Sequence, residues 1–152
     1  ARPLNFDQPF VAAISLCQCA FGFVGAADDA DDSQLLQPDL AVLGGIARAL
    51  RPGGRFAVSA FSAYFQVANL EQSDTFDAAS GVNHERTEIR SEFDESNEVD
   101  LWTTCYTPRE LRLLFERAEL VVDAIHSAET GTYRPLDPAT TTPEFLVLGH
   151  RP

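Results

Sequence analysis

The stretch from Ala47 to Phe61, ARALRPGGRFAVSAF, changes its pattern of apolar residues in the middle. The residues before Arg51 have helical spacing, and RFAVSAF is an apolar run rich in strand-forming residues. Pro52 cannot continue a helix, and the two glycines after it give the backbone freedom for a tight reversal. The stretch therefore predicts a helix, a turn and a strand, which together form one unit of an α/β protein.

Further elements of both kinds follow from periodicity and capping signals. The apolar run from Phe10 to Leu16 predicts a parallel strand that is covered on both faces. Thr107, Pro108 and Glu110 form a capping-box pattern at the start of a helix. The patterns predict helices at 39–50, 62–72 and 107–120, and strands at 10–16, 55–61, 120–128 and 144–151. The last two strands have no helix between them, so we expect them to be antiparallel neighbours.

The segment 82–106 has a different pattern. HERTEIR and EVDLWTTCY partly alternate polar and apolar residues, and DESN between them is a turn signal. We therefore expect a single α/β domain over residues 1–152, with an inserted β-hairpin or lid at 76–106.

Composition limits the possible functions. The 152 residues are enough for one domain with a core. The 11 basic residues, all arginine, face 23 acidic ones and leave a net charge of -12, which argues against nucleic acid and anionic membranes as partners. No apolar segment is long enough to span a bilayer. Three cysteines without a dense framework suit a reducing compartment, so we expect a cytoplasmic protein. The sequence CQC lacks a further Cys/His pair nearby, so no metal site is expected.

The ordered set of segments resembles the carboxy-terminal half of a class I S-adenosylmethionine-dependent methyltransferase. FDQPFVAAISLCQCAFGF resembles the fourth strand of that fold and the loop after it, and VLGGIARALRPGGRFAVSAF resembles the next helix, turn and fifth strand. YTPRELRLLFERAELVVDAI resembles the following helix and strand, and PEFLVLGHR resembles the antiparallel last strand. The resemblance implies a partial Rossmann-like sheet of parallel strands with an antiparallel carboxy-terminal strand, and S-adenosylmethionine as cofactor.

The sequence departs from that family in one respect. The family binds its cofactor mainly through a Gly-rich loop after the first strand, and this sequence has no such loop between a strand and a helix. Methionine is absent, even at position 1, which raises the expectation that the chain is trimmed or a fragment. The absence of a dinucleotide fingerprint also weakens an alternative, a different doubly wound enzyme such as a reductase.

Candidate site residues lie mainly where strands of the predicted sheet end, because ligands of open α/β sheets bind outside the carboxyl ends of the strands. The resemblance implies that the first such loop borders the methyl donor and the second borders the substrate. The expected cofactor-binding residues are Ala1, Arg2, Leu16, Cys17 and Gln18. The expected substrate-binding residues are Cys19, Phe21, Phe61, Trp102 and Tyr133.

Methyl transfer to a nucleophile that carries a proton benefits from a general base. The candidates are His84, Glu85 and Tyr64. Each has a plainer interpretation: an exposed hairpin histidine, a solvated strand residue and a packing residue with a satisfied hydroxyl. Trp102 has one too, since it can anchor the hairpin instead of stacking on a planar substrate.

Two classes of function therefore stay open. The first is methyl transfer to a small-molecule acceptor, with this chain supplying the substrate side. The second is a non-catalytic α/β relic or a partner-binding module. In both, the strand from Phe10 to Leu16 lacks the neighbour that the fold gives it, so we expect either pairing with a missing amino-terminal half or self-association through this edge.

Overall fold

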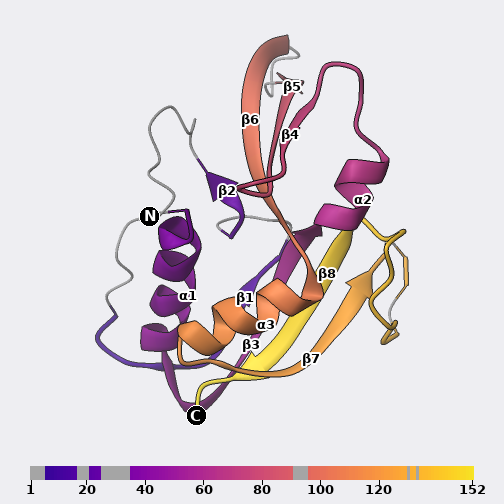
Figure 1. Cartoon of the computed structure of the whole chain (residues 1–152). Coiled ribbons are helices and arrows are strands. Elements are labelled where there is room, and N and C mark those ends of the chain that lie inside the picture. The colour runs from indigo at the N-terminus through magenta and orange to yellow at the C-terminus, as the bar shows by residue number, and fades with distance from the viewer. Residues whose placement is uncertain (1–5, 17–20, 25–34, 91–95, 130, 133) are drawn as a thin grey trace.

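The computed structural model describes residues 6–16, 21–24, 35–90, 96–129, 131–132 and 134–152. These residues form one mixed α/β unit, shown in Figure 1. In chain order the elements are β1 (Phe10–Ser15), β2 (Phe23–Val24), α1 (Gln37–Ala49), β3 (Leu50–Ser62), α2 (Ala63–Ala68), β4 (Thr75–Asp77), β5 (Val82–Arg90), β6 (Ser96–Tyr106), α3 (Pro108–Arg117), β7 (Val121–Ala128) and β8 (Glu144–His150).

The main sheet has β3 at its centre. Strand β1 pairs with β3 in parallel, β8 pairs with the other side of β3 antiparallel, and β7 pairs with β8 antiparallel. This order, in which β8 lies between β3 and β7, confirms the predicted partial Rossmann-like sheet. It also confirms that the last two strands are antiparallel neighbours.

Helices α1 and α3 pack together on one face of this sheet (Figure 1). The predicted capping box of α3 is present: the backbone N–H of Glu110 donates to Thr107 Oγ1 over 3.2 Å, and the N–H of Thr107 donates to Glu110 Oε2 over 3.3 Å. The core lies between the two helices and the sheet. Its buried side chains include Leu43, Ile46, Phe56, Val58, Leu111, Leu114, Phe115, Phe145 and Val147.

Strand β3 begins at Leu50, five residues before the predicted start, because the Pro-Gly-Gly segment is part of the strand. The pairing with β1 shifts register here, so the segment is a bulge and not a free turn. Gly53 has a φ of +73° and its N–H donates to Arg151 O over 2.8 Å. A Cβ on Gly54 would lie 2.8 Å from Arg51 O, so the close approach of the backbone requires glycine there.

The inserted segment is larger than the predicted two-stranded hairpin. Strands β5 and β6 pair antiparallel as expected, but β4 adds a third strand on β5, and the short β2 pairs with β6. In Figure 1 this ribbon rises away from the main sheet. Its lower end belongs to the core, since Cys105 and Tyr106 are buried.

Strand β1 is not covered on both faces, although the sequence predicts that it is. Among the described residues it pairs only with β3. Val11 is 61% exposed and Ile14 is 73% exposed, so apolar side chains of this strand lie open to solvent. The burial predicted for both faces is not found, because it needs elements on the far side of β1 that the described part of the chain does not supply. The open edge agrees with the expectation that this strand lacks the neighbour that the fold gives it.

Candidate functional site

The carboxyl ends of the two parallel strands and the inserted ribbon meet at one edge of the sheet. Strand β1 ends at Ser15, and β3 ends at Ser62, whose hydroxyl accepts the N–H of Phe65 and caps α2. The end of β6 pairs in parallel with the end of β3, Phe61 opposite Cys105. Since β6 carries the ribbon, the ribbon arises from the edge where ligands of α/β sheets bind.

A buried carboxylate lies under this edge. Asp39, in the first turn of α1, is 3% exposed and accepts a hydrogen bond of 2.7 Å from the hydroxyl of Tyr106. Burial raises the pKa of Asp39 to about 6, against the lowering effect of the Tyr106 bond, and the nearby Glu110 raises it further. Phe21 stacks on the Tyr106 ring with centroids 4.8 Å apart. The three side chains join α1, β6 and the segment between β1 and β2.

The ribbon carries a second polar group on the same side of β6. His84 on β5 lies opposite Trp102 on β6, and their rings stack with centroids 4.6 Å apart and planes 12° apart. His84 Nε2 lies 2.9 Å from Asp100 Oδ1. Residues 100, 102, 104 and 106 alternate with the other residues of β6, so this face of the ribbon continues down to Tyr106.

Glu85 points to the other face of the ribbon, because it follows His84 directly in β5. Burial raises the pKa of Glu85, and the charges of Asp74 and Glu71 add to this effect. The structure therefore does not bring His84 and Glu85 together, although both are predicted bases. Tyr64 is exposed on α2, and no hydrogen bond between its hydroxyl and either residue is found in the described part of the chain.

The other predicted site residues have varied positions. Leu16 follows β1 and is exposed, Phe61 is half-buried at the end of β3, and Trp102 has one ring face against His84. Phe21 is fully buried against Tyr106 and Phe115, and these are the contacts of a core residue. Six predicted residues lie outside the described ranges: Ala1, Arg2, Cys17, Gln18, Cys19 and Tyr133.

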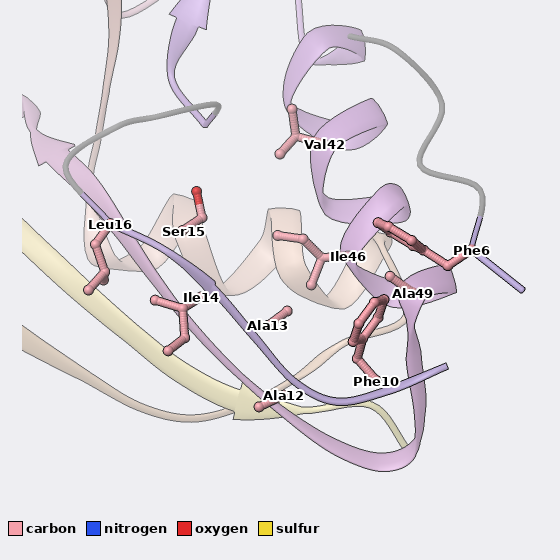
Figure 2. A pocket seen from close by; sticks show the side chains of 10 residues that line it. All are labelled: Phe6, Phe10, Ala12, Ala13, Ile14, Ser15, Leu16, Val42, Ile46 and Ala49. Carbon is pink, nitrogen blue, oxygen red and sulfur yellow. The ribbon is translucent and has the colours of Figure 1, made fainter. Parts of the chain in front are cut away.

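A pocket of about 450 Å³ runs along the open edge of β1 (Figure 2). Its walls come from β1 and from α1, which contributes Val42, Ile46 and Ala49. In Figure 2 the side chain of Ser15 points toward the helices, whereas Ile14 and Leu16 point away from them. The lining is apolar except for the Ser15 hydroxyl, so the pocket suits an apolar or aromatic group.

Sequence reasoning missed Asp100, Asp39 as a buried group, and Tyr106. The sequence gives one weak indication that Asp100 belongs to the site: it lies two residues before Trp102 and so shares the same face of a strand. Its pairing with His84 depends on the register of β5 and β6.

No group of three potential metal-ligating side chains is found among the residues that the structure places. Likewise, none of its described helices is long and apolar enough to cross a membrane.

The described architecture is a mixed α/β sheet with two helices on one face, the antiparallel strand β8 next to β3 and a ribbon at its carboxyl edge. Solved structures with a similar fold include S-adenosylmethionine-dependent methyltransferases. The CcbJ methyltransferase from Streptomyces caelestis superposes with a TM-score of 0.68 at 14% identity, over 95% of this chain and 62% of that one. A methyltransferase from Clostridium acetobutylicum gives a TM-score of 0.64 at 14% identity, over 97% and 61%.

The glycopeptide N-methyltransferase MtfA, solved with S-adenosyl-L-homocysteine, is similar with a TM-score of 0.52 at 13% identity, over 97% of this chain and 57% of that one. The chain thus spans about three fifths of the length of these methyltransferases. No protein-family model matches the sequence, and no curated protein matches it either. The fold of this chain is therefore that of S-adenosylmethionine-dependent methyltransferases.

Proposed function

We propose that the chain takes part in S-adenosylmethionine-dependent methyl transfer to a small-molecule acceptor and supplies the acceptor side of the site. The observation that carries this proposal is the fold match over 95% of the chain, which includes the antiparallel strand β8 beside β3. The ribbon β4–β6 supports it, because it places polar and aromatic side chains above the carboxyl edge. Such a ribbon can align an acceptor and exclude water, which supplies much of the acceleration in an in-line displacement.

The described residues at the end of β1 fit a donor that combines apolar, aromatic and polar parts. The half-buried hydroxyl of Ser15 and the apolar side chain of Leu16 lie where the strand ends, next to an apolar pocket. These two residues would contact the donor, together with Ala1, Arg2, Cys17 and Gln18 as the sequence predicts. When bound, S-adenosylmethionine supplies a methyl group on a positively charged sulfur, and the carbon–sulfur bond breaks with its electrons remaining on sulfur.

Calorimetric titration of S-adenosylmethionine and S-adenosylhomocysteine tests the proposal. The titration is made into this chain and into a version extended upstream in its natural reading frame. We expect the extended version to bind both compounds and this chain to bind them at least about tenfold more weakly, because the family's Gly-rich loop is not in this sequence. The absence of binding by both versions would contradict the proposal.

A second function, a partner-binding module, is favoured by the open edge of β1. An exposed apolar strand offers unpaired backbone groups as well as apolar side chains to another strand. We propose that, in this chain alone, a second copy takes that position and the chains self-associate. The sedimentation of the Ile14→Lys variant tests this, since a charge on the open face of β1 should weaken self-association by about tenfold or more.

The matched control for that variant is Leu113→Lys. Leu113 is 60% exposed on α3, so the change of side chain is similar and only the place differs. The control should associate as the unmodified chain does. A chain that sediments as a monomer before any substitution would overturn the role of β1 as an association edge.

A further inference from the structure

The contacts of His84 differ from those of an ordinary exposed hairpin histidine. Its ring is held on one face by the stacked Trp102 ring, 4.6 Å away, and at one nitrogen by Asp100, 2.9 Å from Nε2. All three residues come from the two paired strands of the ribbon, with His84 directly opposite Trp102. The plane of the imidazole and the direction of Nε2 are therefore both fixed.

The Asp100 contact also decides which ring nitrogen is available. An ionised carboxylate only accepts hydrogen bonds, so in the neutral ring Nε2 must carry the hydrogen and donate it to Asp100. Nδ1 then has a free electron pair. Within the described ranges, no hydrogen-bond partner of Nδ1 is found. The pair thus prepares one nitrogen of His84 to accept a proton.

We propose that Asp100 is a positioning residue that holds His84 as the general base for a methyl acceptor whose nucleophilic atom carries a proton. This inference rests on the proposed methyl transfer. The acceptor class is then a hydroxyl or protonated amine, and an acceptor that needs no proton removal is excluded. The bond between the acceptor atom and its hydrogen breaks, the hydrogen binds to Nδ1, and the electron pair remains on the acceptor atom for the methyl group. The imidazolium that forms is stabilised by the carboxylate of Asp100.

The position of His84 and Trp102 in the fold agrees with the role of His84 as a base. His84 and Trp102 share the face of the ribbon that continues through Thr104 to Tyr106. Tyr106 in turn contacts Asp39 in the first turn of α1 and the Phe21 ring just before β2. That face of the ribbon therefore belongs to the side on which Phe21 and the start of α1 lie, at the carboxyl edge of the sheet.

Two variants and one control test the inference in the upstream-extended protein. Asp100→Asn removes the carboxylate that orients His84, and His84→Gln removes the base. The control is Glu98→Gln, which makes the same chemical type of change two residues earlier on β6. Glu98 has an exposed ion pair of 3.7 Å with Arg86, so its loss leaves the His84 contacts intact.

The first measurement needs no methyl transfer: the ¹⁵N chemical shifts of the His84 ring show which nitrogen carries the hydrogen. We expect the hydrogen on Nε2 in the unmodified protein and in Glu98→Gln, and a mixture or the opposite tautomer in Asp100→Asn. The second measurement is S-adenosylhomocysteine formation with a phenol and a primary amine as probes. We expect kcat to fall by about 10-fold in Asp100→Asn and about 100-fold in His84→Gln, with KM little changed.

The outcomes separate this inference from the proposed function. The absence of donor binding in calorimetry would contradict methyl transfer itself. Methyl transfer with equal kcat in Asp100→Asn and Glu98→Gln would overturn the inference alone.

Discussion

The Gly149→Ala variant is expected to lose most of its stability or not to fold. Gly149 lies in β8, between β3 and β7, and a Cβ there would be 2.0 Å from Val121 O and 2.4 Å from Cζ of the Phe56 ring. The ring could move, but the carbonyl oxygen belongs to the paired strand and cannot move without breaking the sheet. Overpacking alone costs about 1–3 kcal/mol, so we expect a loss of about 3 kcal/mol or more from a typical 5–15 kcal/mol. Urea denaturation measures the free energy of unfolding.

Gly44→Ala is the matched control for this substitution. Gly44 lies inside α1, and the nearest atom to an added Cβ is Arg48 Nη1 at 3.3 Å, the far end of a flexible side chain. Alanine should therefore stabilise the protein by about 0.5–1 kcal/mol through its helix propensity. If Gly149→Ala retained the unmodified free energy of unfolding, the close packing of β7 and β8 against Phe56 described above would be incorrect.

The Asp39→Asn variant is expected to be more stable than the unmodified protein at pH 7.5. The pKa of Asp39 rises from 3.8 to about 6 on folding because the carboxyl group is buried, so the folded state binds the proton more tightly. Stability from this group is therefore present below pH 3.8 and is lost as the pH rises from 3.8 to 6. The full loss is about 3 kcal/mol. At pH 7.5 we expect the free energy of unfolding of the variant to exceed that of the unmodified protein by about 1–2 kcal/mol. At pH 4.5 we expect this difference to be about 2 kcal/mol smaller.

Tyr106→Phe is the comparison, because it should lower the free energy of unfolding at pH 7.5 where Asp39→Asn should raise it. The Tyr106 hydroxyl donates to the buried Asp39 carboxylate, and its removal leaves that charge without this donor. We expect a loss of about 1–3 kcal/mol at pH 7.5 and a smaller loss at pH 4.5, where Asp39 is largely protonated. Urea denaturation at the two pH values measures both variants. An Asp39→Asn variant that is equally destabilised at both would refute the buried ionised carboxylate.

Most of the sheet could be predicted because each element has its own local signal. The helix at 107–120 starts with the Thr107–Glu110 capping box, and the predicted pair of contacts is present. The antiparallel pairing of β7 and β8 could be predicted because no helix pattern lies between the two strands. Strands β2 and β4 could not be predicted, since two and three residues are too short to show a period.

The candidate site was less predictable because its contacts join residues far apart in the sequence. His84 was identified by residue type, but its partner Asp100 is sixteen residues away and depends on the register of β5 and β6. Asp39 begins the helix that the sequence predicts at 39–50, but its buried contact is with Tyr106, 67 residues later, and no local pattern shows that contact. Glu85 and His84 are both candidate bases by residue type, yet neighbours in a strand point to opposite faces, so the two do not meet.

The most direct test of the account is to map where S-adenosylhomocysteine binds, by following the backbone amide resonances of the ¹⁵N-labelled, upstream-extended protein. We predict shifts at Ser15 and Leu16, at the end of β1, and at Phe61, near the end of β3. We also predict none at Gly53 and Arg151, which are hydrogen-bonded to each other at the opposite edge of the sheet. Shifts confined to that opposite edge, or spread evenly over the chain, would contradict a donor site at the carboxyl ends of the strands.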